Sequence, residues 1–422
     1  MEDVLLRKFF ENKRWEDALA KGVFKGIDKG DLRWLTSPQA RAQMYITIRD
    51  GNYEIFPPHM QLIPKDKPGE FRTVYINENV DRIFLSIAND LLFETCGDFI
   101  HKSCVSYQKG IGCGKIVQRA SKQICNTEGG VIGWKSDLSK YFDSIPIEFI
   151  DLAFDNIERK CGKSKVTEVL RKYYHTDLCF DIEGNLAEHY QSLKQGCAVA
   201  SFLADVVLYT IDDTLSKLDG YYVRYSDDCL FIGKDYEKAM QIMKDMLGAM
   251  QMKLNPKKVE YLTHDKWFKF LGFSICGNQI SLSKSRIKTF QKEIEKRTIK
   301  DKNNTPTKAV HKVTSYLYHG DYNGHSWASN VLPIINSEKD IEALNNFTMD
   351  CLRAVATGRK KVGGLGYIPT QEGGVIDRGI GRNVKANRMK TETEIDGYLT
   401  LNCARLAMLS NQEAYETLVR LL

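Results

Sequence analysis

One stretch of the chain constrains the fold more than any other, because it predicts two buried strands joined by a charged turn. The runs Tyr221–Tyr225 and Cys229–Ile232 are rich in aromatic and β-branched side chains, as paired strands are. Between them stand Ser226, Asp227 and Asp228, which predicts a β-hairpin with adjacent carboxylates at its tip. Carboxylates at the end of buried strands are costly unless something pairs with them, so this turn requires an explanation.

Two interpretations of the turn are open from the hairpin alone. Aspartate favours turn geometry, so the turn could simply lie at the surface. A divalent cation is the other explanation, since Mg²⁺ binds one or two carboxylates together with phosphate oxygens. Elsewhere, Asp137 ends an expected strand over Val131–Asp137, at the point where the strand feeds a loop, and this is a common place for a functional carboxylate.

Length and composition bound the class of protein. A chain of 422 residues predicts two or three domains. No apolar stretch is long enough to span a bilayer and the first residues lack a signal-peptide layout, so we expect a cytoplasmic protein without membrane association. The eleven cysteines are scattered without Cys-x-x-Cys or zinc-like spacing, which predicts reduced thiols. The net charge of +6 permits a nucleic-acid partner without establishing one.

Two further segments carry candidate binding residues. A strand, turn and strand over Ile55–Ile76 place Lys65 and Arg72 near the tip of a hairpin, either as solvated charges or as cations that close on a polyanion. Gln195 and Gly196 come just before a helix N-terminus, where exposed backbone N–H groups are available to a substrate. That helix is predicted from a core stripe of Leu203, Val207, Ile211 and Leu215.

A change in composition at about residue 281, where basic residues become dense, predicts a domain boundary. Before it, helices and strands alternate with much antiparallel character, which predicts an α+β fold. After it comes a helix crowded with cations, namely Lys284, Arg286, Lys288 and Lys292, and later a glycine-rich stretch with Arg359, Lys360 and Lys361. These cations suit a nucleic-acid groove with aromatic residues nearby, and a solvated charged face is the alternative. The aromatic residues are Tyr316, Tyr318, Tyr322 and Trp327.

Taken in order, four short motifs resemble those of reverse transcriptases. They are Asp137 with the aromatic residues after it, Gln195-Gly196 followed by Ser201 and Leu203, Tyr225-x-Asp227-Asp228, and Leu271-Gly272. The resemblance covers roughly Pro57 to Ile275. It implies a right-hand polymerase with fingers, a palm built on a small antiparallel sheet, and a mostly α-helical thumb. The implied domains are N-terminal helices and fingers over 1–130, the palm with part of the fingers over 131–280, and the basic helical thumb over 281–422.

The resemblance implies nucleotidyl transfer with two Mg²⁺ ions, for which Mn²⁺ can substitute. Such ions activate a primer 3′-hydroxyl for in-line attack on the α-phosphate and stabilise the leaving pyrophosphate. Asp137 and Asp227 would hold both ions, with Asp228 as a less direct partner and Leu138 completing the predicted metal set. Three carboxylates packed together without a cation would raise one another's pKa values, which also argues for a metal.

Six residues match positions that bind the nucleotide in this family. Phe142, five residues after Asp137, matches the steric gate at which a bulky ring excludes a 2′-hydroxyl, so deoxynucleotides are the implied substrates. The alternative for Phe142 is a plain core role. The resemblance implies that Lys65 and Arg72 clamp the triphosphate. It implies that Gln195 and Gly196 contact the nucleotide and the template strand, and that Lys258 lies near the pyrophosphate.

Departures from the pattern indicate a subtype. Many relatives carry proline where this chain has Ala198 and Phe202. We find no ribonuclease H acid set after the palm, and no endonuclease or maturase-type extension. With its segment Ser106–Gly114, this compact form resembles bacterial retron-type and phage-defence-associated reverse transcriptases, and within them the single-protein type 2 defence class.

The function expected from this resemblance is RNA-directed DNA synthesis. The expected partners are an RNA template, in particular a dedicated non-coding RNA copied in antiviral defence, the DNA product and deoxynucleoside triphosphates. A monomer is favoured. Template-independent or protein-primed synthesis of the abortive-infection type is one alternative, and a non-catalytic RNA-binding scaffold is another. The intact Asp137, Asp227 and Asp228 argue against the scaffold, which needs no metal cluster.

Overall fold

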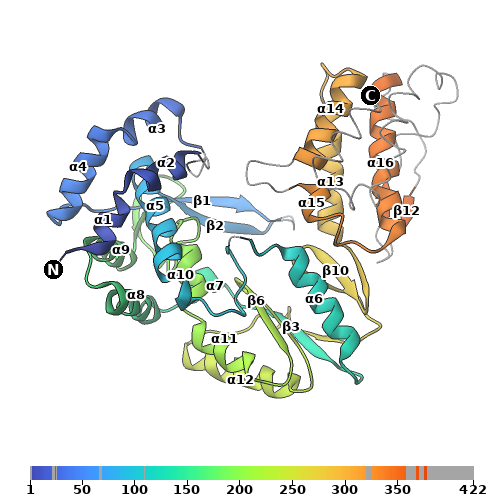
Figure 1. The fold of residues 1–422 in the computed structure, drawn as a ribbon, viewed down its shortest axis with the longest axis horizontal. Helices are drawn as coiled ribbons and strands as arrows, with labels where there is room; N and C mark the ends of the chain where they lie inside the picture. The colour runs from blue at the N-terminus through green and yellow to red at the C-terminus, as the bar shows by residue number, and fades with distance from the viewer. Residues whose placement is uncertain are drawn as a thin grey trace. The chain divides into compact units, whose positions relative to one another are not determined.

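The computed structural model describes residues 2–20, 24, 26–65, 69–108, 110–319, 326–357, 367–369 and 375–377. The chain divides into two compact units, each built from two separate segments (Figure 1). The first unit combines Met1–Lys109 with Gly133–Tyr261, and the second combines Gly110–Ile132 with Leu262–Leu422. These two units do not correspond to fingers, palm and thumb, so the predicted three-part division at residues 130 and 280 stays a prediction.

A four-stranded sheet at the centre of the first unit contains the expected hairpin. Its order is β6-β7-β3-β8, and both β6 and β3 run antiparallel to β7. The prediction of this hairpin, and of a strand that ends at Asp137, is confirmed. Aromatic packing anchors the sheet, since the rings of Trp134 and Phe231 stack with centroids 6.0 Å apart. The strands are β3 (Gly133–Asp137), β6 (Tyr221–Tyr225), β7 (Asp228–Ile232) and β8 (Glu260–Leu262).

The helix expected over residues 203–218 is interrupted. It forms α10 (Ala200–Val206) and α11 (Tyr209–Ser216), and Leu203, Ile211 and Leu215 are buried as expected. In a continuous helix the carbonyl groups of Ala204 and Asp205 would accept hydrogen bonds from N–H groups four residues later. They accept instead from the guanidinium of Arg224, at 3.2 and 2.9 Å, and the Ala204 carbonyl also accepts from the hydroxyl of Tyr141 at 2.5 Å, so these two buried side chains end the helix.

The helices around this sheet pack through apolar faces. α11 contacts β6, whereas α12 lies against β3 and β7. The indole N–H of Trp134 donates to the carbonyl of Tyr236 at 2.8 Å, which ties β3 to the start of α12. These helices are α7 (Tyr141–Ser144), α8 (Ile147–Cys161), α9 (Lys165–Tyr174) and α12 (Tyr236–Ala249).

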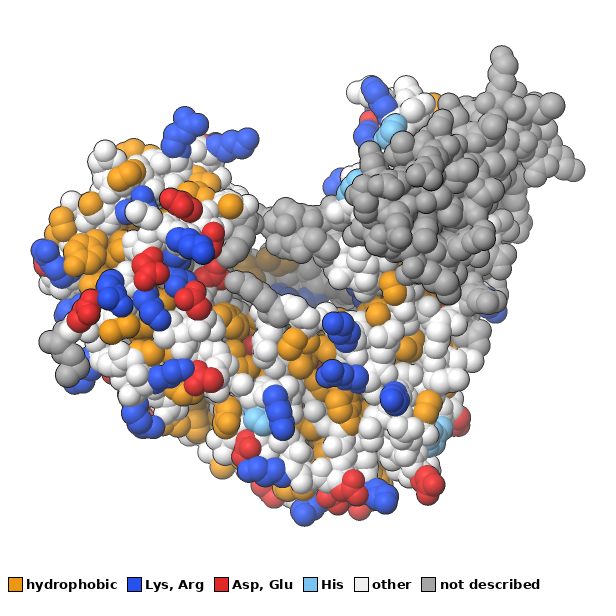
Figure 2. All heavy atoms as spheres, viewed as in Figure 1, with side chains coloured by type: hydrophobic (Ala, Val, Ile, Leu, Met, Phe, Trp, Pro, Cys, Tyr) orange, Lys and Arg blue, Asp and Glu red, His pale blue; other side chains and the backbone are white. Residues whose placement is uncertain are grey.

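The N-terminal helices of the first unit close over α5. Phe9, Trp15 and Phe84 meet in one aromatic cluster, and α1 and α2 contact α5. Figure 2 shows basic, acidic and apolar side chains mixed over the face of these helices that it presents. The helices are α1 (Val4–Phe9), α2 (Asn12–Ala20), α3 (Lys29–Leu35), α4 (Pro38–Arg49), α5 (Asn79–Cys96) and the 3₁₀ turn η1 (Gly97–Phe99).

A second sheet in the first unit, ordered β2-β1-β4-β5, contains the other expected hairpin. β1 pairs with β2 in antiparallel register, Ile63 opposite Arg72, which confirms the prediction. β4 joins β1 through a single parallel pair, His59 with Phe180, whose rings also stack 4.7 Å apart. The strands are β1 (His59–Pro64), β2 (Phe71–Ile76), β4 (Leu178–Phe180) and β5 (Leu186–Glu188).

The second unit packs α6 against a three-stranded antiparallel sheet, ordered β11-β10-β9, and follows it with helices. α6 is held there by the hydroxyl of Ser121, which donates to the carbonyl of Gly277 at 2.8 Å. In the described part of the chain, the helices fall short of the length and hydrophobicity that crossing a bilayer requires. The last part of the thumb predicted over 281–422, from residue 378 on, lies outside the described residues.

The elements of the second unit are α6 (Cys113–Asn126), β9 (Phe268–Phe270), β10 (Phe273–Cys276), β11 (Gln279–Leu282), α13 (Lys284–Arg297), α14 (Pro306–Thr314), the π-helical turn η2 (Ser315–His319), α15 (Trp327–Asn330), α16 (Glu338–Thr357), β12 (Tyr367–Pro369) and β13 (Val375–Asp377).

Candidate active site

The sheet of the first unit brings three carboxylates to one end of neighbouring strands. In the antiparallel pair of β3 and β7, Asp137 lies directly opposite Asp228. Asp227 stands in the turn that precedes β7, and its carbonyl accepts a hydrogen bond from the N–H of Leu138 at 3.0 Å. Two segments 90 residues apart in sequence therefore place Asp137, Leu138, Asp227 and Asp228 together.

The turn itself is tight. Tyr225 pairs with Asp228, so only Ser226 and Asp227 connect the strands. Ser226 has a φ of 56°, whereas Asp227 does not have a positive φ. A positive φ at the first residue alone is typical of a type II′ turn, where glycine is usual. Serine at this position is strained, and strain of this kind persists only where the surroundings hold it.

The charges at this site are unbalanced. Burial, followed by the charges of Asp137 and Asp228, raises the pKa of Asp227 to about 6. Burial also raises the pKa of Asp228, against the opposing effect of Lys135. One cation already lies here, since the ammonium of Lys258 is 2.6 Å from Oδ2 of Asp137. Its side chain is 56% exposed whereas that of Asp137 is 10% exposed, so Lys258 reaches in from solvent to a nearly buried carboxylate.

This donor set suits a magnesium ion in its chemistry. Mg²⁺ typically takes one or two carboxylates and completes its shell with water and substrate phosphates. Asp137 and Asp227 would provide the carboxylates and Leu138 a backbone carbonyl, and the ammonium of Lys258 already pairs with Asp137. Within the described ranges, no three or more His, Cys, Asp and Glu side chains are grouped so as to hold a metal by themselves. The predicted metal set of Asp137, Leu138, Asp227 and Asp228 therefore stays a prediction.

Phe142 lies on the short helix α7, beside the acids in sequence. Its ring is half-buried against the core and meets that of Tyr141 edge to face, 5.7 Å between centroids. Its carbonyl accepts from the N–H of Leu193 at 3.0 Å, which links α7 to the loop before Gln195. Half-burial fits both a ring presented to a sugar and a partial core role, so the steric gate stays a prediction.

Gly196 is required by backbone packing. It has a φ of 110°, and a Cβ added to it would lie 2.8 Å from the carbonyl oxygen of Tyr75. The carbonyl of Gln195 accepts from the N–H of Tyr75 at 2.7 Å, so the loop is bonded directly to β2. The predicted contacts of Gln195 and Gly196 with nucleotide and template therefore start from a loop that is held against the hairpin.

A buried lysine that the sequence pattern did not single out stabilises this loop. The ammonium of Lys194 donates to the carbonyl of Thr176 at 2.7 Å and to the side chain of Gln191 at 3.2 Å. It also lies 4.9 Å from the centre of the Tyr173 ring. Burial lowers the pKa of Lys194 to about 8. No sequence pattern distinguishes this lysine from a surface one, because two of its partners, Thr176 and Tyr173, come before β4 in the chain.

The hairpin of β1 and β2, called the fingers hairpin below after its predicted domain, carries its two predicted cations exposed to solvent. Lys65 and Arg72 are both exposed, and the N–H of Lys65 donates to the carbonyl of Glu70 at 2.9 Å. Burial raises the pKa of Asp143 on α7, and Lys140, His189 and Lys65 oppose that rise, which places Lys65 within electrostatic reach of α7. Their role in clamping a triphosphate stays a prediction.

A family model described as reverse transcriptase (RNA-dependent DNA polymerase) matches residues 63–275, just over half of the chain. This chain belongs to the reverse transcriptase family. The α+β polymerase fold and the enzyme class predicted from the sequence are thereby confirmed, since the family is that of RNA-directed DNA polymerases, which are nucleotidyltransferases. The match begins in β1 and ends in β10.

Comparisons with individual proteins give more distant similarities. No curated protein matches the sequence. Solved structures that are similar include apo telomerase from Candida tropicalis, with a TM-score of 0.46 and 12% identity over 82% of this chain and 74% of that one. The same telomerase truncated from its C-terminal domain aligns with a TM-score of 0.42 and 16% identity over 56% and 58%. Telomerase from Candida albicans in complex with a TWJ fragment of telomeric RNA aligns with 0.40 and 12% over 73% and 60%. The chain thus spans 58% and 60% of the last two.

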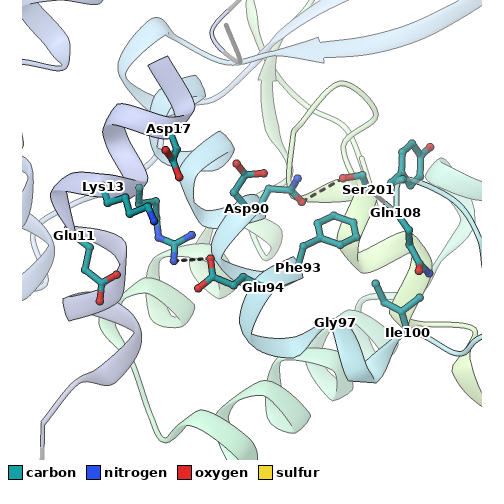
Figure 3. Close-up of a pocket in the computed structure, with 13 residues that line it drawn as sticks. Glu11, Lys13, Asp17, Asp90, Phe93, Glu94, Gly97, Ile100, Gln108 and Ser201 are labelled. Carbon is teal, nitrogen blue, oxygen red and sulfur yellow. Dashed lines mark hydrogen bonds and ion pairs between the residues drawn. The ribbon is translucent and has the colours of Figure 1, made fainter. Parts of the chain in front are cut away.

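A pocket of about 750 Å³ in the first unit of this reverse transcriptase is lined in part by Ser201 and by Tyr107, whose hydroxyl donates to Oγ of Ser226 at 3.4 Å. Figure 3 shows side chains of α2, α5 and the segment before residue 109 around it, with Arg14 paired to Glu94 at 3.0 Å. Carboxylates outnumber cations in its lining, which includes Glu11, Asp17 and Asp90. This excess of carboxylates disfavours phosphate groups in the pocket.

In the second unit of the reverse transcriptase, α13 presents an exposed row of lysines. Ile287, Phe290 and Ile294 are buried on the opposite face, so the helix is amphipathic. Arg286 does not join the row, because its guanidinium lies 4.6 Å from the ring of Phe273 and burial lowers its pKa. The row, called the lysine row below, consists of Lys284, Lys288, Lys292 and Lys296.

The aromatic residues expected beside these cations do not provide stacking faces. Trp327 and Tyr318 are 7% and 1% exposed. The indole N–H of Trp327 donates to the hydroxyl of Tyr316 at 2.8 Å, and Arg297 lies 4.2 Å from the Tyr316 ring. The expectation of an aromatic groove at Trp327 and Tyr318 was therefore wrong, because these rings form the core of the unit. Tyr322, Arg359, Lys360 and Lys361 lie outside the described residues.

Proposed function

We propose that this protein is an RNA-directed DNA polymerase that adds deoxynucleotides to a 3′-hydroxyl, with two divalent metal ions, Mg²⁺ in the first place, held by Asp137 and Asp227. The observation that carries the proposal is the strand register, which sets Asp137 opposite Asp228 with Asp227 in the turn. When bound, the ions would activate the hydroxyl and stabilise charge on the phosphates. Family membership supports the reaction type.

Four further side chains would bind and select the nucleotide. Lys65 and Arg72, exposed on the fingers hairpin, bind the triphosphate, Arg72 through a planar fork and Lys65 as a point charge. Lys258 would bind the pyrophosphate through its ammonium, which lies beside the acids on a side chain that is half exposed. Phe142 would lie under the sugar and exclude a 2′-hydroxyl, and the partial burial of its ring is compatible with this role.

The template and cellular role belong to the same proposal. We propose that the template is a dedicated non-coding RNA copied in antiviral defence, and that the protein acts in the cytoplasm. The compact motif arrangement around Ser106–Gly114 supports the first part. The scattered cysteines, without Cys-x-x-Cys spacing, support a reducing compartment. The lysine row on α13 provides charge for the nucleic-acid duplex.

Template-dependent primer extension tests the proposed function. Purified protein is given a defined RNA template, an annealed primer and Mg²⁺, with either deoxynucleotides or ribonucleotides, and parallel reactions omit the RNA. The proposal predicts complementary DNA only with RNA and deoxynucleotides. DNA of low complexity without RNA would establish template-independent synthesis instead. RNA binding without any incorporation would establish the scaffold.

A further inference from the structure

Both backbone groups of Ser226 are held by side chains from outside the turn. The N–H of Ser226 donates to the hydroxyl of Ser106 at 3.0 Å. The carbonyl of Ser226 accepts from the guanidinium of Arg224 at 3.2 Å. Ser106 lies 120 residues earlier in the chain, so the turn is fixed from a distant segment as well as from its own strand.

The two holding groups are themselves fixed. Ser106 donates its hydroxyl proton to Oδ1 of Asp205 at 2.5 Å, so its lone pair faces the Ser226 N–H. Arg224 is fully buried and donates to both carboxylate oxygens of Asp212. Its Nη2 lies 2.6 Å from Oδ2 and its Nε lies 2.9 Å from Oδ1. These bonds leave neither side chain free to rotate away from the turn.

The segment that carries Ser106 is bonded along β6. The N–H of Val105 donates to the carbonyl of Arg224 at 2.9 Å, and the N–H of Arg224 donates to the carbonyl of Ser103 at 2.8 Å. Ser103–Val105 thus forms a short parallel addition to the strand that leads into the turn. Ser106 is the first residue after this addition, which explains how it reaches the tip of the hairpin.

Water does not replace these contacts. The exposed fractions of Ser106 and Arg224 are both 0%, and that of Ser226 is 4%. A backbone N–H that loses its acceptor at such a place is left unbonded, and Ser226 already has the left-handed φ that serine disfavours. Without its two contacts the turn would populate other conformations, and the carboxylate of Asp227 would move with it.

We propose that Ser106 and Arg224 are positioning residues that clamp the backbone of Ser226 and so aim the carboxylate of Asp227 for nucleotidyl transfer. This inference rests on the proposed function. Neither residue touches substrate, so each acts through the turn. A misplacement of a catalytic group by about 1 Å costs up to 100-fold in rate, which sets the scale of the effect.

Ser106→Ala is the direct test, with Ser121→Ala as the matched control. Ser121 is another buried serine, and its hydroxyl likewise bonds to a distant segment, the carbonyl of Gly277, but it lies on α6 of the second unit. The clamp predicts that Ser106→Ala lowers kcat about 10-fold or more while KM for the deoxynucleotide changes less than twofold. It also predicts that the Ser226 amide exchanges its hydrogen at least about 10-fold faster, by mass spectrometry of peptides spanning 225–229. Ser121→Ala should change neither.

The value of kcat and the exchange rate of the Ser226 amide must change together if the clamp exists. A lower kcat with unchanged exchange at Ser226, or faster exchange with unchanged kcat, would overturn the clamp. A wild type that never incorporates nucleotide would overturn the proposed function, and the exchange measurement would still report on the clamp. Ser106→Thr keeps the hydroxyl and should restore both readouts towards wild type.

A folding defect is handled by a second substitution. Ser106→Cys nearly keeps the volume of the side chain but replaces its oxygen with a weak acceptor. If Ser106→Ala does not fold, Ser106→Cys should show the lower kcat and the faster exchange, and wild-type values would overturn the proposal. If neither variant folds, Ser106 supports the whole fold and its assignment as a positioning residue is overturned.

Discussion

At the scale of single residues, Asp227 lies in surroundings that favour its neutral form. Its pKa is raised to about 6 by burial and by the charges of Asp137 and Asp228. In the unfolded chain the pKa of an aspartate is about 4, so between these values the folded state binds more protons than the unfolded state. The stabilisation from protonation is therefore present at low pH and is lost as the pH rises through about 6.

Removing this charge should stabilise the metal-free protein. In EDTA at pH 7.5, Asp227→Asn is expected to raise the free energy of unfolding by about 2 kcal/mol, because it removes a buried charge that repels two others. At pH 5 the gain should shrink, since the wild-type carboxyl is then protonated. Urea unfolding at both pH values measures this, with Asp245→Asn on the exposed face of α12 as the control. A destabilised variant at pH 7.5 would contradict the electrostatic account.

At the scale of elements, the loop before α10 depends on close approach to β2. Gly196→Ala should lower the free energy of unfolding by about 2 kcal/mol or more, because its Cβ would meet the Tyr75 carbonyl and its φ of 110° is unfavourable for alanine. Gly162→Ala is the matched control, since Gly162 also has a positive φ of 82° but has open space around it. The difference between the two variants in urea unfolding isolates the clash, and equal values would exclude it.

The lysine row on α13 should carry a measurable share of nucleic-acid affinity. Its members follow at four-residue intervals, about 6 Å apart along the helix. Lys288→Gln is expected to reduce the slope of log affinity against log salt concentration by about 0.9 for each duplex phosphate that the side chain neutralises in the wild type. Lys122→Gln on α6, also exposed, keeps the same net charge and should leave the slope unchanged. Equal slopes for both variants would make the row a solvated face.

The local sequence pattern predicted the strands and hairpins whose structure depends on neighbouring residues alone. The hairpin from Tyr221, the strand to Asp137 and the fingers hairpin all follow from β-branched runs and turn residues, and the site acids follow from their motifs. The break between α10 and α11 could not be predicted, because it depends on the carbonyls of Ala204 and Asp205 turning to Arg224. A charge in the middle of an apolar strand was nevertheless a signal that Arg224 needed a buried partner.

At the scale of the whole molecule, each unit is assembled from two separate segments. Sequence reasoning places a boundary where composition changes, as it does near Ser281. It could not place α6 in the second unit, because the partners of α6 in β10 and β11 come about 150 residues later. Likewise, burial of Trp327 and Tyr318 follows from packing in the second unit and not from any local pattern.

Truncation tests this arrangement. A chain that ends at Tyr261 keeps α6 but lacks the sheet that covers it, so Ile116, Val117 and Ile124 would be exposed. We expect such a chain to bind a hydrophobic dye and to aggregate in size-exclusion chromatography. Replacing 110–132 in the same chain by a glycine-serine linker should restore a monomer. A monomeric truncated chain that protects its α6 amides from exchange would contradict the division.

The central claim is that Asp137 and Asp227 form the polymerase centre, and the most direct test is the rate of single-nucleotide incorporation. Wild type and Asp227→Asn are compared on one RNA template and primer with Mg²⁺, beside Asp245→Asn. The account predicts a fall of at least about 1000-fold for Asp227→Asn, with template binding and folding intact, and no change for Asp245→Asn. A folded Asp227→Asn protein that incorporates deoxynucleotide at the wild-type rate would contradict it.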